Sequence, residues 1–278
     1  MTLQAGTLTL KNQHLAKDFI HGPADPDVVA YVAAVEAADG AGLEEGVKVA
    51  YADFITGCKA DGIWNSIKAS CILAGARTLN GALVPLVGSA PTNVGPFIGS
   101  DYDRKTGLLG NGSKYLNANR ADNADGQTDS HRSVYVTTPA TGVFGAYIGL
   151  VYTTPSFSLS FILRDGSGNQ LYIQERDSAG SFTISGAQNA TGFIGGSRAN
   201  SVWYDARVNG STVQNFNVPA TPVTGGTNFV FSRSFNGTPD STINAGRISF
   251  YSIGSALDLS LLDSRVSTLM TDLAAVLP

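Results

Sequence analysis

The stretch Gly246-Arg247-Ile248-Ser249-Phe250-Tyr251-Ser252-Ile253-Gly254 decides the fold, because apolar and polar residues alternate along it. Such alternation is typical of a β-strand with one buried face. The strand, expected over 245–253, runs into a region where apolar residues recur at helical spacing. These residues are Leu259, Leu262, Val266, Leu269, Leu273 and Val276. The sequence therefore predicts a closing helix over 256–277.

An Asn-Gly pair marks a hairpin upstream of this strand. Asn209-Gly210 separates the expected strands 201–209 and 211–218, and both central residues of a type I′ turn need a positive φ. Turn residues recur about every 8–12 residues, which is typical of a sandwich or jelly roll. One such turn is predicted at Gly192-Phe193-Ile194-Gly195-Gly196. The remaining strands are expected at 113–117, 131–137, 143–151, 156–164, 169–176, 181–185 and 227–234.

The N-terminal part has a helical pattern instead. Asp25-Pro26-Asp27 is a helix start, with Asp25 as N-cap and Pro26 in the first turn. A second helix is expected from about residue 43. A third helix is expected after Asp61, which would be its N-cap, with apolar residues at helical spacing: Ile63, Ile67, Cys71 and Ala74.

These patterns divide the chain into four predicted parts. Residues 1–24 form an arm with a short β element, and residues 25–78 form a helical domain for docking or oligomerisation. Residues 79–106 are a Pro- and Gly-rich connector without long regular elements. Residues 107–278 form the jelly-roll domain, including the closing helix over 256–277. The expected fold class is therefore mainly β, an antiparallel sandwich preceded by a small helical domain.

Composition narrows the function classes. Charged residues make up 14% of the 278 residues, and the net charge of −4 disfavours a nucleic-acid binder, which needs a basic face. No apolar run approaches the roughly 20 residues of a membrane-spanning helix, so no membrane insertion is expected. No secretion signal is evident at Met1, so we expect the chain to fold in a cytoplasm.

Three stretches of the β region resemble concanavalin-A-like and laminin-G-like jelly rolls. They are the alternating strand Ser156–Arg164, the hairpin at Asn209-Gly210, and the strand Gly246–Gly254 that leads into Ala256-Leu257-Asp258. Ahead of them, Ala60-Asp61-Gly62-Ile63-Trp64 and Leu73–Leu79 resemble a segment that precedes such jelly rolls in tailed-phage and prophage virion proteins. The resemblance implies a virion protein of the fibre, spike or decoration type.

Catalytic motifs are sparse in the β region. Hydrolysis of a glycan needs two carboxylates in different environments, and Glu175 with Asp177 is the one pair at suitable spacing. Asp177 opens the turn Asp177-Ser178-Ala179-Gly180, which favours a structural role. His131 is interpreted as a surface or interface residue. We therefore expect a protein that is not an enzyme.

Ligand binding is the better prospect, through aromatic platforms and hydrogen-bonding side chains. The candidates are Trp203, Tyr204 and Tyr172 as platforms, with Arg176 and Arg207 as donors to sugar hydroxyls. Trp203 and Tyr204 are adjacent on a strand, so one should be in the core and the other exposed.

An acidic segment is the candidate calcium loop. It offers Asp122, Asp125 and Asp129 within eight residues, and calcium accepts six to eight oxygen ligands in irregular loops. The spacing does not match an EF-hand loop, and an ordinary solvated loop is the competing interpretation. No other cofactor is expected.

The resulting hypothesis is a non-enzymatic virion protein, assembled in the host cytoplasm. Residues 1–80 would dock on other virion proteins, and the jelly roll would attach to a host cell-surface glycan or protein. The resemblance to phage fibres implies a homotrimer. The alternatives are a capsid or tail decoration protein without a ligand, and a polysaccharide hydrolase that uses Glu175.

Overall fold

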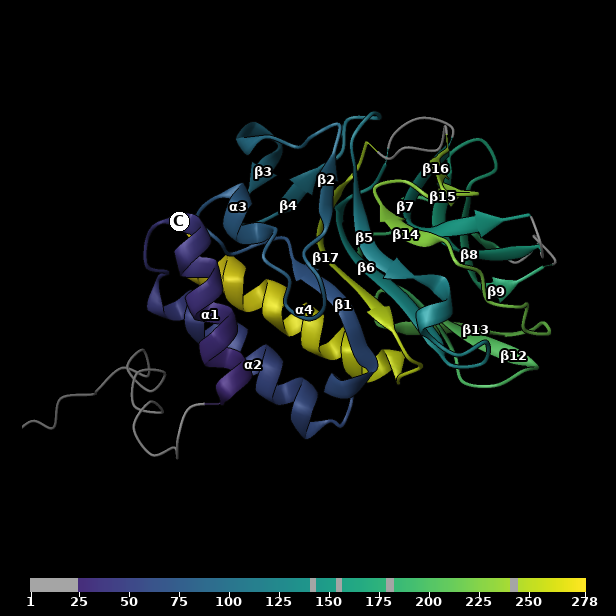
Figure 1. Cartoon of the computed structure of the whole chain (residues 1–278), viewed down its shortest axis with the longest axis horizontal. Helices are drawn as coiled ribbons and strands as arrows, with labels where there is room; N and C mark the ends of the chain where they lie inside the picture. The colour runs from purple at the N-terminus through teal and green to yellow at the C-terminus, as the bar shows by residue number, and fades with distance from the viewer. Residues whose placement is uncertain (1–24, 141–143, 154–156, 179–182, 241–244) are drawn as a thin grey trace, which may run out of the picture.

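Two β-sheets pack face to face, and helices cover the outer face of one of them (Figure 1). The computed structural model describes residues 25–140, 144–153, 157–178, 183–240 and 245–278. The arm predicted over 1–24 lies outside these residues. Within these described ranges the strand pairings are antiparallel except for one short parallel pair, β15 with β7.

The first sheet has the strand order β13-β12-β11-β6-β17-β4-β3, and β1 also pairs with β17. Because β4 pairs with the start of β17 and β1 with the rest, the two share one edge of β17. The strands of this sheet are β1 (Ile67–Ile72), β3 (Tyr102–Asp103), β4 (Gly107–Leu109), β6 (Ser130–Thr138), β11 (Gly192–Arg198), β12 (Trp203–Val208), β13 (Ser211–Asn217) and β17 (Arg247–Gly254).

The second sheet has the order β10-β9-β8-β7-β14-β5-β2, with β15 on β7 and β16 on β15. Its strands are β2 (Thr92–Val94), β5 (Tyr115–Ala121), β7 (Phe144–Tyr152), β8 (Ser158–Asp165), β9 (Gln170–Asp177), β10 (Thr183–Ser185), β14 (Thr227–Val230), β15 (Ser234–Phe235) and β16 (Thr238–Pro239).

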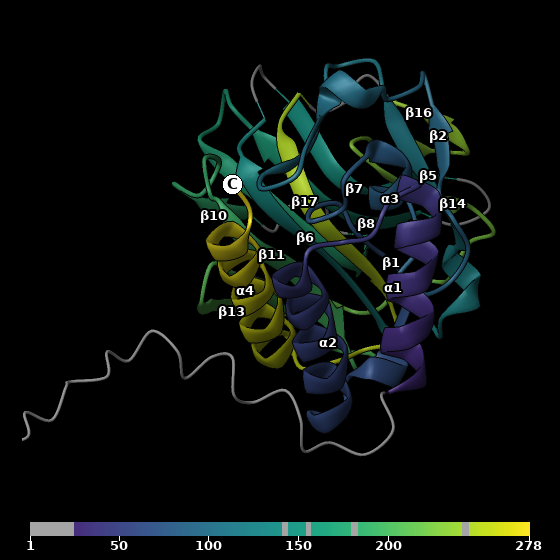
Figure 2. The same ribbon diagram turned by 90° about the vertical axis from the view of Figure 1, so that its left-hand side faces the viewer.

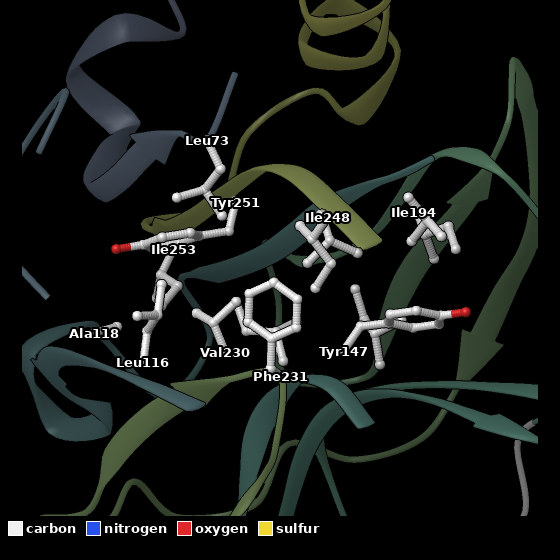
Figure 3. Close-up of a cluster of buried hydrophobic side chains, with 14 of the residues drawn as sticks. Leu73, Leu116, Ala118, Tyr147, Ile194, Val230, Phe231, Ile248, Tyr251 and Ile253 are labelled. Carbon is white, nitrogen blue, oxygen red and sulfur yellow. The ribbon is translucent and has the colours of Figure 1, made fainter. Parts of the chain in front are cut away.

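Apolar side chains from both sheets meet in the space between them (Figure 3). Ile248 and Tyr251 of β17 point toward Val230 of β14 and the adjoining Phe231. All four side chains are fully buried. Ile248 and Tyr251 are three residues apart, and both face this core because the pairing of β17 with β6 is irregular between Ile248 and Phe250.

A second core lies on the other side of the first sheet, under the helices (Figure 2). It joins side chains of α1, α2 and α4 to Phe193 and Phe250, which point away from the sandwich interior. The Phe54 ring of α2 meets the Phe250 ring edge-on, with centroids 5.7 Å apart. The helices are α1 (Pro26–Asp39), α2 (Glu45–Ala60), α3 (Leu79–Ala82) and α4 (Leu259–Val276), with 3₁₀ turns at Trp64–Ser66, Gly99–Asp101 and Asp122–Ala124.

The predicted third helix is wrong, because residues 67–72 form strand β1. Asp61 is the C-cap of α2 rather than an N-cap, and β1 pairs with β17. Five of the six residues of β1 are buried, so the strand shows no alternation. A short apolar run of this kind cannot be distinguished from a buried helix by its period. Residues 25–78 are therefore joined to the sandwich by a continuous sheet and a shared core.

The predicted turn at 192–196 is also wrong, because these residues begin β11 in the middle of the first sheet. Every residue of β11 is buried, one face under the second sheet and the other under α4. A Cβ atom on Gly195 would lie 3.0 Å from Leu259 Cδ2. The glycine thus permits the close approach of α4 to the sheet.

The mainly β sandwich and its closing helix are confirmed. Strands are found in all ten predicted strand regions, and α4 begins three residues later than predicted, at Leu259. Asp258 caps α4, accepting hydrogen bonds from the backbone of Ser260 and Leu261. Among the described residues, none of the helices combines the length and apolar character needed to cross a membrane.

Candidate functional site

Two of the predicted ligand residues, Arg176 and Tyr204, lie in the interior of the sandwich. Both are fully buried. The Tyr204 hydroxyl donates to the Ile173 carbonyl oxygen at 3.0 Å, and Arg176 Nη2 donates to the Asp122 carbonyl oxygen at 2.8 Å. Neither side chain is available to a ligand at the surface. The prediction that Trp203 and Tyr204 face opposite sides is confirmed, with Tyr204 in the core.

Arg132 organises a buried network of charges around these residues. Its guanidinium donates to Asp122 Oδ1 at 2.8 Å, to Asn228 Oδ1 at 2.7 Å, and to Glu175 Oε1. Arg132, Asp122 and Glu175 are each at most 2% exposed. Glu175, the carboxylate on which the hydrolase hypothesis depends, therefore faces an arginine inside the protein rather than a substrate.

The calcium loop is contradicted, because arginines and backbone groups occupy its carboxylates. Asp122 pairs with Arg132, and Asp125 Oδ2 accepts from Arg120 Nε at 2.8 Å. Asp129 lies elsewhere, where its Oδ1 accepts the backbone N–H of Ala256 at 2.7 Å. Calcium needs several oxygens that face a common centre. Within the described part of the chain, no three His, Cys, Asp or Glu side chains could hold a metal ion.

The remaining predicted residues lie on two different surfaces. Tyr172 packs against the outer face of the second sheet, and its hydroxyl donates to Gln170 Oε1 at 3.1 Å. Trp203 and Arg207 lie on β12 of the first sheet, with Asp205 between them. Residues two apart on a strand share a face. Arg207 Nε donates to Asp263 Oδ2 of α4 at 2.7 Å, so this face is the one on which α4 lies.

An open cleft of about 500 Å³ lies beside these side chains, between β12 and the segment that leads into α4. This volume is in the range of small-molecule sites, roughly 300–1,000 Å³. We call it the β12–α4 cleft. Its lining consists of Ala199, Asp205, Ala256, Leu257, Asp258, Leu259 and Ser260.

Trp203 and Asn217 extend the polar surface of the β12–α4 cleft along the strand. Trp203 is half-buried and lies on the same face of β12 as Asp205, which is two residues further along the strand. Asn217 is the direct cross-strand partner of Trp203 on β13 and is exposed. An aromatic ring, a carboxylate and an amide thus lie on one continuous face, a combination that can stack on a sugar ring and bond its hydroxyls.

The wall of the cleft is fixed by hydrogen bonds to both sheet strands beside it. Ser197 Oγ of β11 donates to the Leu257 carbonyl oxygen at 2.8 Å. His131 Nδ1 of β6 lies 2.6 Å from the Ser255 carbonyl oxygen, and the Asp129 carboxylate holds Ala256. His131 is fully buried, so its predicted surface role is wrong. The segment 255–258 is therefore held in place before any ligand arrives.

Asp258 is ionised in the cleft. Hydrogen bonds from Ser260 hold the pKa of the Asp258 carboxyl below its usual range, although partial burial opposes them. The side chain also accepts from the Leu261 backbone N–H, so it satisfies the donors at the start of α4. A general acid needs a raised pKa, and Asp258 does not meet that requirement.

Asp205, Asp258 and Asn217 were missed as site residues in the sequence. Alternation around Trp203 could have identified Asp205, because it shares the strand face of both Trp203 and Arg207. The pattern Asp258-Leu259-Ser260 before an apolar helical run is an N-cap signal. No local pattern brings these two carboxylates together, since their proximity depends on how α4 packs on β11 and β12.

The fold and the cleft define a two-layer β-sandwich protein with an open polar site at the junction of its first sheet and its closing helix. No protein-family model matches the chain, and no curated protein matches it.

Several solved structures are similar in part. A sialidase NanB structure from Streptococcus pneumoniae is similar with a TM-score of 0.42 and 12% identity, over 57% of this chain and 27% of that one. The botulinum neurotoxin serotype D binding domain has a TM-score of 0.48 and 13% identity, over 73% of this chain and 51% of that one.

The CBM40 module of a Ruminococcus gnavus sialidase is similar with a TM-score of 0.37 and 12% identity, over 50% of this chain and 82% of that one. The same module has been described bound to α2,3-sialyllactose. This chain spans about a quarter of the length of the S. pneumoniae sialidase. At these similarities the argument for function depends on the cleft residues alone.

Proposed function

We propose that the protein binds a glycan in the β12–α4 cleft. The observation that supports this most strongly is that Trp203 and Asn217 lie on the same sheet face as Asp205, which lines a cleft of about 500 Å³. Sugars are bound by a flat apolar ring for one face and by fixed polar groups for the hydroxyls. The hydrogen bonds to Ala256 and Leu257 hold the cleft wall in place, which reduces the ordering cost of binding.

We propose a binding role rather than a catalytic one. Glycan hydrolysis needs one carboxyl with a raised pKa beside a second ionised carboxylate. Glu175 is buried against Arg132, and the pKa of Asp258 is lowered by its capping bonds. Neither carboxylate therefore supports the hydrolase alternative.

Replacing Trp203 with Ala should weaken glycan binding about tenfold or more, because stacking aromatics carry much of the energy of such sites. The measurement is a glycan array probed with the full chain and with the variant. Trp64→Phe is the matched control, because Trp64 follows α2 and lies over Lys59, on another part of the surface. Equal array signals for wild type and Trp203→Ala would place the binding site elsewhere, and no signal at all would favour a decoration protein without a ligand.

The virion role is a further proposal, supported by the sequence resemblance. In it, residues 1–80 dock on other virion proteins and the chain forms a trimer, with the glycan cleft facing the host. The groove between α1 and α2 supplies apolar surface for assembly, since Val29 is 52% and Val49 37% exposed.

Light scattering of the full chain tests the assembly proposal. The expected mass is that of a trimer, and Val29→Glu should shift it toward the monomer because a charge would be buried in the interface. A wild-type protein that is a monomer at every concentration would contradict the trimer.

A further inference from the structure

Helix α1 is apolar on both of its faces. Its 14 residues include three charged ones, Asp27, Glu36 and Asp39. One face packs on the core through Tyr31 and Val35, which are buried. A helix that is apolar all round is normally covered on both sides. The outer face of α1 therefore needs a cover that the described residues do not supply.

Helices α1 and α2 lie side by side (Figure 2), and the outer face of α1 forms one wall of an open groove between them. We call it the α1–α2 groove. Its volume is about 400 Å³. Its apolar lining consists of Val28, Val29, Val32, Ala33, Val49 and Ala52. Exposed apolar surface of this kind marks an interaction site.

The charged side chains of the α1–α2 groove give it a negative balance. Glu36, Glu45 and Lys48 also line it. Lys48 Nζ pairs with Glu36 Oε1 at 3.1 Å, while Glu45 is exposed at the start of α2. The groove is therefore suited to an apolar segment that carries a positive charge.

The sequence directly before α1 contains a segment of this character. Asp25 caps α1, and 24 residues precede Asp25. Among them, apolar residues recur at the spacing of one helix face. They are Leu15, Ala16, Phe19 and Ile20, with Lys17 between them. Anchors at this spacing are those with which a helical segment enters an apolar groove.

The linker between this segment and α1 determines which groove it can enter. Residues 21–24 span at most about 14 Å, since an extended chain covers about 3.3–3.6 Å per residue. Pro23 and Pro26 favour an extended backbone at Gly22 and Asp25, and Asp25 has a ψ of 126°. A short extended linker directs the segment away from its own α1 and toward an adjacent molecule.

We propose that the segment Leu15–Ile20 of one copy docks in the α1–α2 groove of a neighbouring copy. This inference rests on the assembly proposed above and specifies the contact that produces it. Phe19 and Ile20 cover the apolar lining, and Lys17 faces Glu45. Because the segment and the groove are different surfaces, the contact is head-to-tail, and repeated contacts of this kind close a ring.

Disulfide cross-linking of the full chain tests the contact. A chain with Phe19→Cys is co-expressed with a tagged chain that carries Val49→Cys, and the purified protein is oxidised with glutathione disulfide. Cys58 and Cys71 are buried, so they should not compete. A mixed disulfide between the two chains should form about tenfold faster than with Val202→Cys, because docking raises the effective concentration of the two thiols. Val202 is the matched control, since it is 53% exposed and directly precedes β12.

A substitution in the segment supplies a second measurement, without any cross-link. Phe19→Asp places a charge against the apolar lining and should raise the dissociation constant of the assembly about tenfold or more. Leu8→Asp makes the same kind of change outside the segment and should leave the constant unchanged. Light scattering over a range of protein concentrations measures both variants.

The outcomes separate this inference from the assembly proposal. If the wild type is an oligomer but Val49→Cys and Val202→Cys cross-link equally, the docking contact is overturned and assembly stands. If a chain with both Phe19→Cys and Val49→Cys forms its disulfide within one molecule, the segment covers its own groove, and exchange between copies is overturned. If the wild type is a monomer at every concentration, the assembly proposal itself fails.

Discussion

Replacing Arg132 with Met should lower the free energy of unfolding by about 3–5 kcal/mol, because it leaves a buried carboxylate without its counter-charge. Glu175 would retain only the hydroxyl of Ser130 as a hydrogen-bond donor to Oε1. Asp122 would keep Arg176, whose Nη2 lies 3.3 Å from its Oδ1. Most of the loss should therefore come from Glu175, and urea unfolding measures it.

A second substitution distinguishes the charge effect from lost packing. In the Arg132→Met background, Glu175→Gln removes the uncompensated charge and should recover part of the stability, a coupling that a double-mutant cycle reports. Arg265→Met is the control for an ion pair nearer the surface, since its side chain is 35% exposed and pairs with Asp61. That change should cost less than about 1 kcal/mol. A loss at Arg132 no larger than at Arg265 would contradict the role of the buried network.

Lowering the pH from 6.5 toward 4 should reduce the unfolding free energy by about 3 kcal/mol through His131 alone, since one pKa unit corresponds to about 1.4 kcal/mol. Burial lowers the pKa of His131 from 6.5 to about 4, despite the nearby carboxylates of Glu175 and Asp125. Because the Ser255 carbonyl only accepts, Nδ1 carries the proton and Nε2 accepts from Ser252 Oγ.

The direction of this effect follows from proton uptake. Between pH 6.5 and 4 the unfolded chain binds a proton at His131 that the folded protein does not, so unfolding becomes easier as the pH falls. The contribution is fully present above pH 6.5 and is lost by about pH 4. His131→Gln has no ring to titrate, and its stability should lack this component. Thermal unfolding of both proteins between pH 7 and 4.5 measures this component. An equal dependence of stability on pH in wild type and variant would contradict the role of His131.

Acidic pH also weakens a pair at the surface, in a lower window. The Arg104 guanidinium lowers the pKa of Glu44 from 4.5 to about 2. Stability from this pair is present above pH 4.5 and is lost as the pH falls toward 2. The Glu44 side chain is 33% exposed, so solvent screening keeps its contribution below about 1 kcal/mol. The loss of stability between pH 6.5 and 4.5 therefore includes the titration of His131 but not that of the Glu44 carboxyl.

The sandwich could be predicted from sequence wherever polar and apolar residues alternate along a strand or a hairpin turn has a specific signal. Alternation located β8 and β17, and the Asn209-Gly210 pair located the hairpin between β12 and β13. β8 and β17 are also almost wholly buried, but serines alternate with their apolar residues. β1 was missed because Ile67 and Cys71 also fit a helical spacing, and β11 because Gly192, Gly195 and Gly196 favour a turn. The helices α1, α2 and α4 were also predicted. Their packing on the first sheet, as in the contact between Phe54 and Phe250, joins residues distant in sequence and has no local pattern.

The environment of the polar residues of the candidate site also could not be predicted from local sequence. Arg176, Asp122 and Glu175 were interpreted as a sugar-binding donor, a calcium ligand and a possible catalytic carboxylate, roles that require access to a ligand. They are buried because each finds a partner distant in sequence, as Glu175 does in Arg132. Trp203 and Tyr204 were correctly placed on opposite faces of one strand. The carboxylate of Asp258, which completes the cleft, reaches it through the packing of α4.

The emission of Trp203 during a glycan titration tests most directly whether the β12–α4 cleft is the binding site. Trp64 and Trp203 are the two tryptophans of the chain, so Trp64→Phe makes Trp203 the sole indole reporter. We predict a saturable change in its emission, with the same dissociation constant as calorimetry gives for that glycan. Heat of binding without any change in Trp203 emission would contradict the account, because the ligand would then bind away from this cleft.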